Sequence, residues 1–180
     1  MLFAPDIEVA LRSVVNLINS AANGDEQLAT EQDLDRFLEA EGFAGSRTGD
    51  AAELASVHRL RAELAALWRA EESAAVDTVN RLLRQARALP QLVKHDQWDW
   101  HLHATTPEAP LADRMSTEAA MALVDVIRSK EMDRMLVCAA EDCDAVVLDL
   151  SRNRSKRYCD TGNCANRAHV AAYRARKAAS

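Results

Sequence analysis

The segments Cys138-Ala-Ala-Glu-Asp-Cys143 and Cys159-Asp-Thr-Gly-Asn-Cys164, separated by fifteen residues, contain every cysteine of the chain. Two pairs with the same spacing suit one tetrahedral zinc ion, because each tight turn can present two thiolate sulfurs. Four sulfurs at about 2.3 Å complete the coordination of Zn²⁺ and leave no position for a catalytic water. We therefore predict that Cys138, Cys143, Cys159 and Cys164 bind one structural zinc ion, which replaces a hydrophobic core in this segment.

Two disulfides or an iron–sulfur cluster are the alternatives for the four cysteines. The chain begins Met1-Leu-Phe-Ala-Pro-Asp-Ile-Glu8, which lacks the basic segment of a secretory signal. No uncharged stretch approaches the roughly 20 residues that a membrane helix needs. We therefore expect a cytoplasmic protein with no membrane partner, in which thiols stay reduced and clustered cysteines favour a metal ion.

Short strands and a helix are predicted around the cysteines. Met135–Val137 and Val146–Leu148 have the composition of strands, and Arg157-Tyr158 is interpreted as the return strand that carries Cys159. From residue 165 to 177 the chain is rich in Ala and lacks Gly and Pro, so a helix should begin at the last ligand. This order of knuckle, hairpin and helix is a treble-clef-like arrangement.

The residues before this module predict a helical domain. Apolar residues recur at helical spacing after five residues suited to capping a helix, which are Asp6, Thr30, Asp50, Ser73 and Ser116. Only five Gly and four Pro occur in 180 residues, which also favours helices. The predicted fold class is mainly α, with a helical domain at 1–131 and a four-cysteine zinc finger at 132–180.

A strand period interrupts the helices near residue 100. In Trp98-Asp-Trp-His-Leu-His103 apolar residues alternate with polar ones, and Leu92-Val93 can supply the partner strand of a small β-hairpin. We interpret Trp98 and Trp100 as core residues and the opposite side as a polar face. A metal or effector site is the alternative for that face, because His101 and His103 would point to the same side.

Charge is divided unevenly along the chain. The net charge is −6, yet residues 151–180 carry eight Lys or Arg and one acid, a net +7, which leaves −13 on residues 1–150. Such a basic segment indicates a polyanionic partner, above all DNA, although the whole chain is acidic. The candidate nucleic-acid contacts are these bases and one amide, namely Arg152, Arg154, Lys156, Arg157, Asn166, Arg167, Arg174, Arg176 and Lys177.

The same bases also have a structural interpretation. Four thiolates and Zn²⁺ sum to a charge of about −2, which nearby cations can neutralise. Arg154, Arg157 and Arg167 lie close in sequence to the ligands and are the candidates for this role. The last three bases would stabilise the C-terminus of the predicted helix.

Four motifs lie in and around the cysteine pairs: Cys-x4-Cys, then Asp149-x-Ser-Arg-Asn-Arg-Ser-Lys-Arg-Tyr-Cys159, Cys164-Ala-Asn-Arg167 and Tyr173-Arg-x-Arg176. Over residues 137–177 they resemble the CGNR zinc finger. Ala165 stands where that family has its Gly, and Ala suits the position if it is helical but would be strained at positive φ. The helical part resembles the ABATE domain of bacterial proteins classed as stress-induced transcription regulators, through Val14-Val-Asn-Leu17 and Leu60-Arg-Ala-Glu-Leu64.

This resemblance implies a DNA-binding transcription regulator, whose zinc finger contacts nucleic acid and whose helical domain senses a small effector or forms a homodimer. A zinc-stabilised protein-interaction adaptor is one alternative. A metal-dependent hydrolase that uses His101 and His103 is another. No phosphate-binding Gly loop, nucleophile elbow or His-Glu-x-x-His motif occurs, so we do not expect an enzyme.

Overall fold

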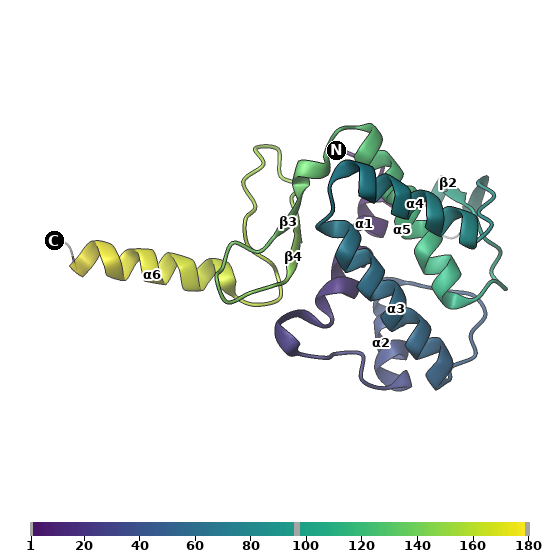
Figure 1. The fold of residues 1–180 in the computed structure, drawn as a ribbon, viewed down its shortest axis with the longest axis horizontal. Helices are drawn as coiled ribbons and strands as arrows, with labels where there is room; N and C mark the ends of the chain where they lie inside the picture. Colours follow the sequence, from purple (N-terminus) through teal and green to yellow (C-terminus); the bar gives the residue numbers. More distant parts are fainter. Residues whose placement is uncertain (1, 96–97, 179–180) are drawn as a thin grey trace.

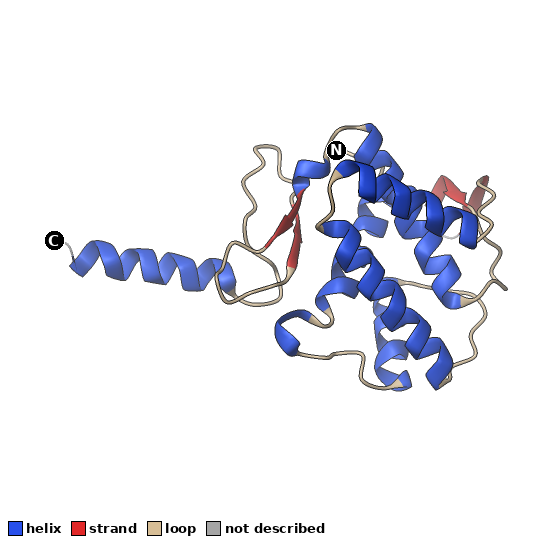
Figure 2. Cartoon of the chain, viewed as in Figure 1, coloured by secondary structure: helices blue, strands red, loops and turns tan. Residues whose placement is uncertain are grey.

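Amphipathic helices build the larger part of the molecule (Figures 1 and 2). The computed structural model describes residues 2–95 and 98–178. In this part of the chain the helices are α1 (Pro5–Asn19), α2 (Glu31–Glu41), α3 (Ala51–Trp68), α4 (Glu72–Gln85), α5 (Leu111–Arg128) and α6 (Cys164–Ala178), with 3-10 turns η1 (Ala22–Gly24) and η2 (Met132–Arg134). Two antiparallel strand pairs complete the fold, β1 (Gln91–His95) with β2 (Trp98–His103) and β3 (Met135–Val137) with β4 (Val146–Leu148). The mainly α prediction is confirmed.

Helices α1, α3 and α5 surround the hydrophobic core. Leu11 of α1, Leu64 of α3 and Leu123 of α5 are almost completely buried in it, and α4 packs against α5. Met135, Val146 and Leu148 join the same core, although they belong to the strands beside the cysteines. The two parts of the molecule therefore share one core.

Helix starts were predicted well where the capping side chain is the decisive signal. Thr30 and Asp33 form a capping box at α2, and the Asp50 side chain accepts the Glu53 N–H at α3. The other three predicted caps, Asp6, Ser73 and Ser116, lie inside helices α1, α4 and α5. Pro5 occupies the first turn of α1 and Pro110 precedes α5, so the fixed φ of proline marks these starts.

The hairpin at residues 91–103 forms as predicted, with Leu92 opposite Leu102. The interpretation of Trp100 as a core residue is wrong, because 66% of its surface is exposed. The side chain of Trp98 lies outside the described part of the structure. Alternation identifies two faces of a strand but not which face meets the core, and here the apolar face carries exposed Leu92, Trp100 and Leu102.

The partner of β4 differs from the prediction. It is β3, with Leu136 opposite Val147, and residues 157–158 form no strand. Asp149 accounts for this difference, because its buried carboxylate accepts the N–H groups of Ser151 and Lys156 and closes the intervening loop. The returning chain instead meets the first knuckle, where Ala139 N donates to Arg157 O at 2.9 Å.

Hydrogen bonds fix the strands beside the cysteines to the helices. Asn19, only 4% exposed, donates to Val146 O at 3.0 Å and accepts from Val146 N at 2.7 Å, as a neighbouring strand would. The indole N–H of Trp68 donates to Leu136 O at 3.0 Å. These bonds hold the cysteine module in one orientation on α1 and α3.

Candidate metal centre and basic surface

The four cysteine side chains converge between the ends of β3, β4 and α6. Their sulfur atoms all lie within 4.8 Å of one another. Cys143 Sγ is 3.7 Å and Cys164 Sγ 3.6 Å from Cys159 Sγ. A tetrahedron with metal–sulfur bonds of about 2.3 Å has sulfur–sulfur edges of about 3.8 Å, whereas a disulfide is about 2.05 Å long. The four cysteines thus form the site of one structural zinc ion.

Local backbone geometry positions each ligand. Cys138 follows β3 and is held by Ala145 O, and Cys143 closes the first turn by donating to Ala140 O. The N–H of Cys159 lies 3.4 Å from the sulfur of Cys138, and Cys164 is the first residue of α6. Ala165 is therefore helical, so the residue that replaces the family's Gly suits its position.

The thiols of the site ionise unequally without metal. Burial raises the pKa of the Cys143 thiol to about 12. Burial also acts on Cys159, but hydrogen bonds from Thr161 and the Gly162 N–H outweigh it and lower the pKa of Cys159 to about 7. Since zinc binds thiolates and displaces their protons, the ion itself supplies the charge that lets Cys143 ionise at neutral pH.

Arg167 lies directly over the metal centre. Its guanidinium is 3.2 Å from Cys164 Sγ and donates to both carboxylate oxygens of Asp142. Bonding to Asp142 and Cys164 raises the pKa of Arg167, so its charge is permanent. This geometry favours the structural interpretation of Arg167, in which it offsets the negative charge of the zinc–thiolate centre.

Two further bases are paired within the molecule. Arg154 binds Glu131 at 2.9 Å and also contacts Asp133, and Lys156 binds Asp160 at 2.6 Å. Exposed pairs of this kind contribute little to stability and exchange readily with other anions. Arg154 and Lys156 therefore remain accessible to a polyanion only in competition with these carboxylates.

The remaining predicted contact residues lie on two exposed segments. Arg152 and Arg157 are exposed in the loop after β4, and Asn166 is exposed on the first turn of α6. Figure 1 shows α6 extending away from the helical bundle. Every described residue from 169 to 178 is exposed, including the last three bases, Arg174, Arg176 and Lys177. The outer part of the helix thus presents three basic side chains to solvent.

The histidines of the hairpin do come together. His101 Nε2 lies 3.0 Å from His103 Nε2, and the rings meet edge to face. Within the described residues, however, the four cysteines are the one group of three or more His, Cys, Asp or Glu that could hold a metal ion. The hydrolase alternative therefore lacks a third protein ligand in this part of the structure.

Fold and site together define a helical domain joined to a four-cysteine zinc finger. Residues 11–130 match the ABATE family, described as "Putative stress-induced transcription regulator", and residues 134–177 match the CGNR zinc finger. The chain therefore belongs to the ABATE family and carries a CGNR zinc finger. The ABATE description is that of a family of regulators. Among curated proteins, none matches the chain significantly. Across the described residues, no helix combines the length and apolar character that crossing a bilayer requires.

Sequence reasoning missed the residues that connect the two parts. Asn19 occupies a buried position on the mainly apolar side of α1, and Arg69 donates to Asp144 O at 2.6 Å. A polar residue within an apolar helical stripe was the available signal for Asn19, since buried amides need partners. Its partner, a backbone 127 residues away, could not be predicted from a local pattern.

Proposed function

We propose that this protein is a DNA-binding transcription regulator that uses α6 and the loop at residues 151–157 to contact nucleic acid. The observation that carries the proposal is the basic, uncovered surface of α6. The helix contains no acidic residue, and its outer ten residues are exposed on every side. The phosphates of a polyanion would neutralise the basic side chains of this helix, and the polyanion would cover its exposed surface.

The dimensions of α6 suit a DNA groove. Its 15 residues span about 22 Å, and a major groove about 12 Å wide admits one α-helix. The zinc centre fixes the first turn through Cys164, so the helix is presented from a rigid base. We assign phosphate contacts to Arg174, Arg176 and Lys177 on the helix and to Arg152 and Arg157 in the loop. Asn166 is the candidate for a base-edge contact.

The remaining assignments belong to the same proposal. Residues 132–180 bind DNA, and residues 1–131 respond to a small effector or mediate homodimer formation. The protein acts in the cytoplasm, where reduced thiols keep the zinc site intact. Arg154, Lys156 and Arg167 contribute to DNA binding through their charge, after exchange of their intramolecular partners.

The test is the salt dependence of duplex binding by the zinc-loaded full-length protein, followed by fluorescence anisotropy. A log–log slope of about −0.9 per phosphate contact is expected, and Arg174→Ala should make it shallower by about one. Arg59→Ala, an exposed arginine on α3, is the matched control and should leave the slope unchanged. If zinc-loaded protein fails to bind duplex DNA even at low salt, the DNA-binding proposal is wrong.

A protein-interaction adaptor is the second candidate, and one observation favours it. Val170 and Tyr173, 40% and 60% exposed, lie three residues apart on α6 and form a small apolar strip on one side of the helix. Such a strip suits a groove on a partner protein. Tyr173→Ala separates the candidates, because it should abolish adaptor binding but leave the salt slope of DNA binding unchanged.

A further inference from the structure

A polar cavity lies where α1 meets the zinc finger. It has a volume of about 140 Å³ and is walled by Arg12 and Asn16 of α1, by β4, and by Lys156 and Thr161 of the finger. A second hollow of about 360 Å³ shares Asn16, Asn19 and Thr161 in its lining, so the two hollows adjoin each other, and together they are called the cleft. One water molecule occupies roughly 30 Å³ in the liquid, so the cleft can hold a small metabolite.

Arg12 is the charged group of this cleft that lacks a partner among the described residues. The others are paired: Lys156 with Asp160 at 2.6 Å, Arg36 with Asp33, and Glu41 with the amide of Asn16 at 2.8 Å. Lys156 and Asp160 cancel each other's charge, as do Arg36 and Asp33, whereas Glu41 in the larger hollow keeps its negative charge because its partner is a neutral amide. In the smaller cavity, Arg12, Lys156 and Asp160 sum to one positive charge, and the Arg12 guanidinium is a donor group directed at no acceptor among the described residues.

The edge of β4 adds a backbone donor on another wall of the cavity. Cys138 N bonds Ala145 O and Asp149 N bonds Arg134 O, so residues 145, 147 and 149 direct their polar groups to the β3 side. Alternation directs those of Val146 and Leu148 to the opposite edge. The Asn19 amide bonds both the N–H and the C=O of Val146, and the N–H and C=O of Leu148 lie on this same edge of β4, which lines the cavity.

We propose that this cavity binds a small oxyanion, the phosphate or carboxylate group of a metabolite, held between Arg12 and the Leu148 N–H. An arginine on one wall of a cavity and a backbone N–H on another are donors that phosphate and carboxylate oxygens accept from. Lys156 and Thr161 line the same cavity from the finger, where Lys156 is paired with Asp160 and the Thr161 hydroxyl bonds the Cys159 sulfur. The adjoining hollow, with Leu28 and Phe37 in its wall, takes the rest of the ligand.

The cavity lies directly beside the metal module. Cys159 and Thr161 line it and belong to the second zinc knuckle, which leads into α6. A bound anion would bridge α1 and this knuckle. This inference rests on the proposed function only where it identifies the bound anion as the effector of the helical domain. Anion binding itself does not require DNA.

The experiment is calorimetric titration of zinc-loaded full-length protein with inorganic phosphate and, in a separate arm, with citrate, at constant ionic strength set by chloride. We expect saturable binding of one anion per chain, weakened about tenfold or more by Arg12→Ala, since a charge-assisted pair is lost. Arg59→Ala serves again as the control and should bind like the unmodified protein. The arm with the higher affinity identifies a phosphate or a carboxylate ligand.

Equal affinity in the Arg12→Ala and Arg59→Ala proteins, or binding of both anions that does not saturate, would overturn the proposal. A duplex-binding measurement on the same proteins separates it from the DNA proposal. If Arg12→Ala makes the salt slope shallower by about one while neither anion binds, Arg12 contacts DNA and the anion site is wrong. Anion binding that depends on Arg12, in a protein that binds no duplex, would support the site and contradict DNA binding.

Discussion

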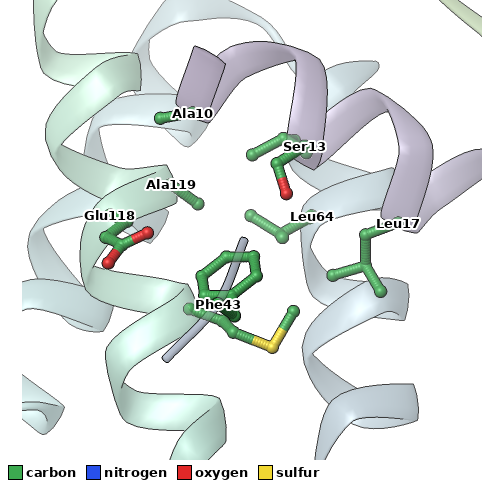
Figure 3. Close-up of a pocket in the computed structure, with 9 residues that line it drawn as sticks. Ala10, Ser13, Leu17, Phe43, Leu64, Glu118 and Ala119 are labelled. Carbon is green, nitrogen blue, oxygen red and sulfur yellow. The ribbon is translucent and has the colours of Figure 1, made fainter. Parts of the chain in front are cut away.

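Glu118 places a carboxyl group beside a small apolar pocket between α1 and α5, close to Ala10, Ser13 and Phe43 (Figure 3). No hydrogen bond to its carboxyl group is found within the described residues, and burial raises its pKa from 4.5 to about 7, against the opposing charge of Arg114. The folded state therefore retains a proton that the unfolded state releases at lower pH. Ionisation of Glu118 at this buried position therefore lowers the stability of the folded state, and this loss of stability is the cost of ionisation.

The sign of the resulting pH dependence follows from the pKa of Glu118 in the unfolded chain, 4.5, and in the folded protein, about 7. The cost is absent below 4.5, grows as the pH rises from 4.5 to about 7, and is complete above that range. Because the side chain keeps some contact with water, we expect a cost of about 2 kcal/mol rather than the full value of the shift. The effect of Glu118→Gln on the free energy of unfolding should therefore be more stabilising at pH 8 than at pH 4 by this amount. Urea denaturation at the two pH values measures the difference. Glu39→Gln, an exposed control on α2, should show no such difference, and equal pH profiles for both variants would contradict the prediction.

At the scale of single residues, local signals predicted what local geometry determines. Thr30 and Asp50 were identified as caps because a cap is a contact across three residues. The four cysteines were assigned to one metal ion because their spacing carries the coordination chemistry. Asn19 and Asp149 were missed, because their roles depend on segments that only the folded chain brings together.

Elements show the same division between local and non-local information. Strands 135–137 and 146–148 were predicted from composition, but their mutual pairing was not, since it depends on the loop that Asp149 closes. The hairpin at 91–103 was recognised from its alternation, but the apolar face that was assigned to the core is exposed. A pattern identifies an element, whereas its partner and its orientation are properties of the whole fold.

Helix α6 is anchored to the rest of the protein at its start. Cys164 and Arg167 fix the first turn to the metal centre, whereas residues 169–178 are all exposed. An isolated helix of fewer than about 12 to 15 residues is marginally stable in water. The outer part of α6 therefore depends on its own helix propensity.

We expect the backbone amides of residues 170–178 to exchange hydrogen at least about a hundredfold faster than those in the middle of α5, which is buried in the core. Duplex DNA should slow their exchange, because contacts along the helix stabilise it. Hydrogen exchange followed by mass spectrometry measures both effects, with α5 peptides as the internal control. Slow exchange of this segment in the free protein would show that α6 is covered in solution, and would remove the main support for a DNA-binding surface.

At the scale of the whole molecule, the zinc finger is part of the structure of the helical domain. A separate module would leave the bundle complete without it, yet Met135, Val146 and Leu148 complete the core built by α1, α3 and α5. Trp68 and Asn19 donate to backbone carbonyls of β3 and β4. The zinc ion therefore stabilises the strands, and the strands in turn close one side of the bundle.

This arrangement predicts that removing zinc destabilises the helices as well as the finger. Exposure of three core side chains costs about 1.5 kcal/mol or more each, or about 5 kcal/mol in sum. That loss should lower the Tm of the helical domain by about 10 °C or more, because 1 kcal/mol shifts the Tm of a protein of this size by about 2 to 4 °C. Circular dichroism at 222 nm, which is insensitive to the metal itself, can follow the transition before and after treatment with a strong chelator.

Two controls separate this effect from damage to the chain. Returning zinc should restore the original Tm, and Cys159→Ser should show the low Tm without any chelator, because three cysteines cannot complete the site. The zinc-loaded protein should unfold in one cooperative transition, since a shared core couples the two parts. A helical transition that keeps its Tm after zinc removal would mean that the bundle folds independently of the finger, and that an anion between α1 and the second knuckle could not transmit its binding through a common core.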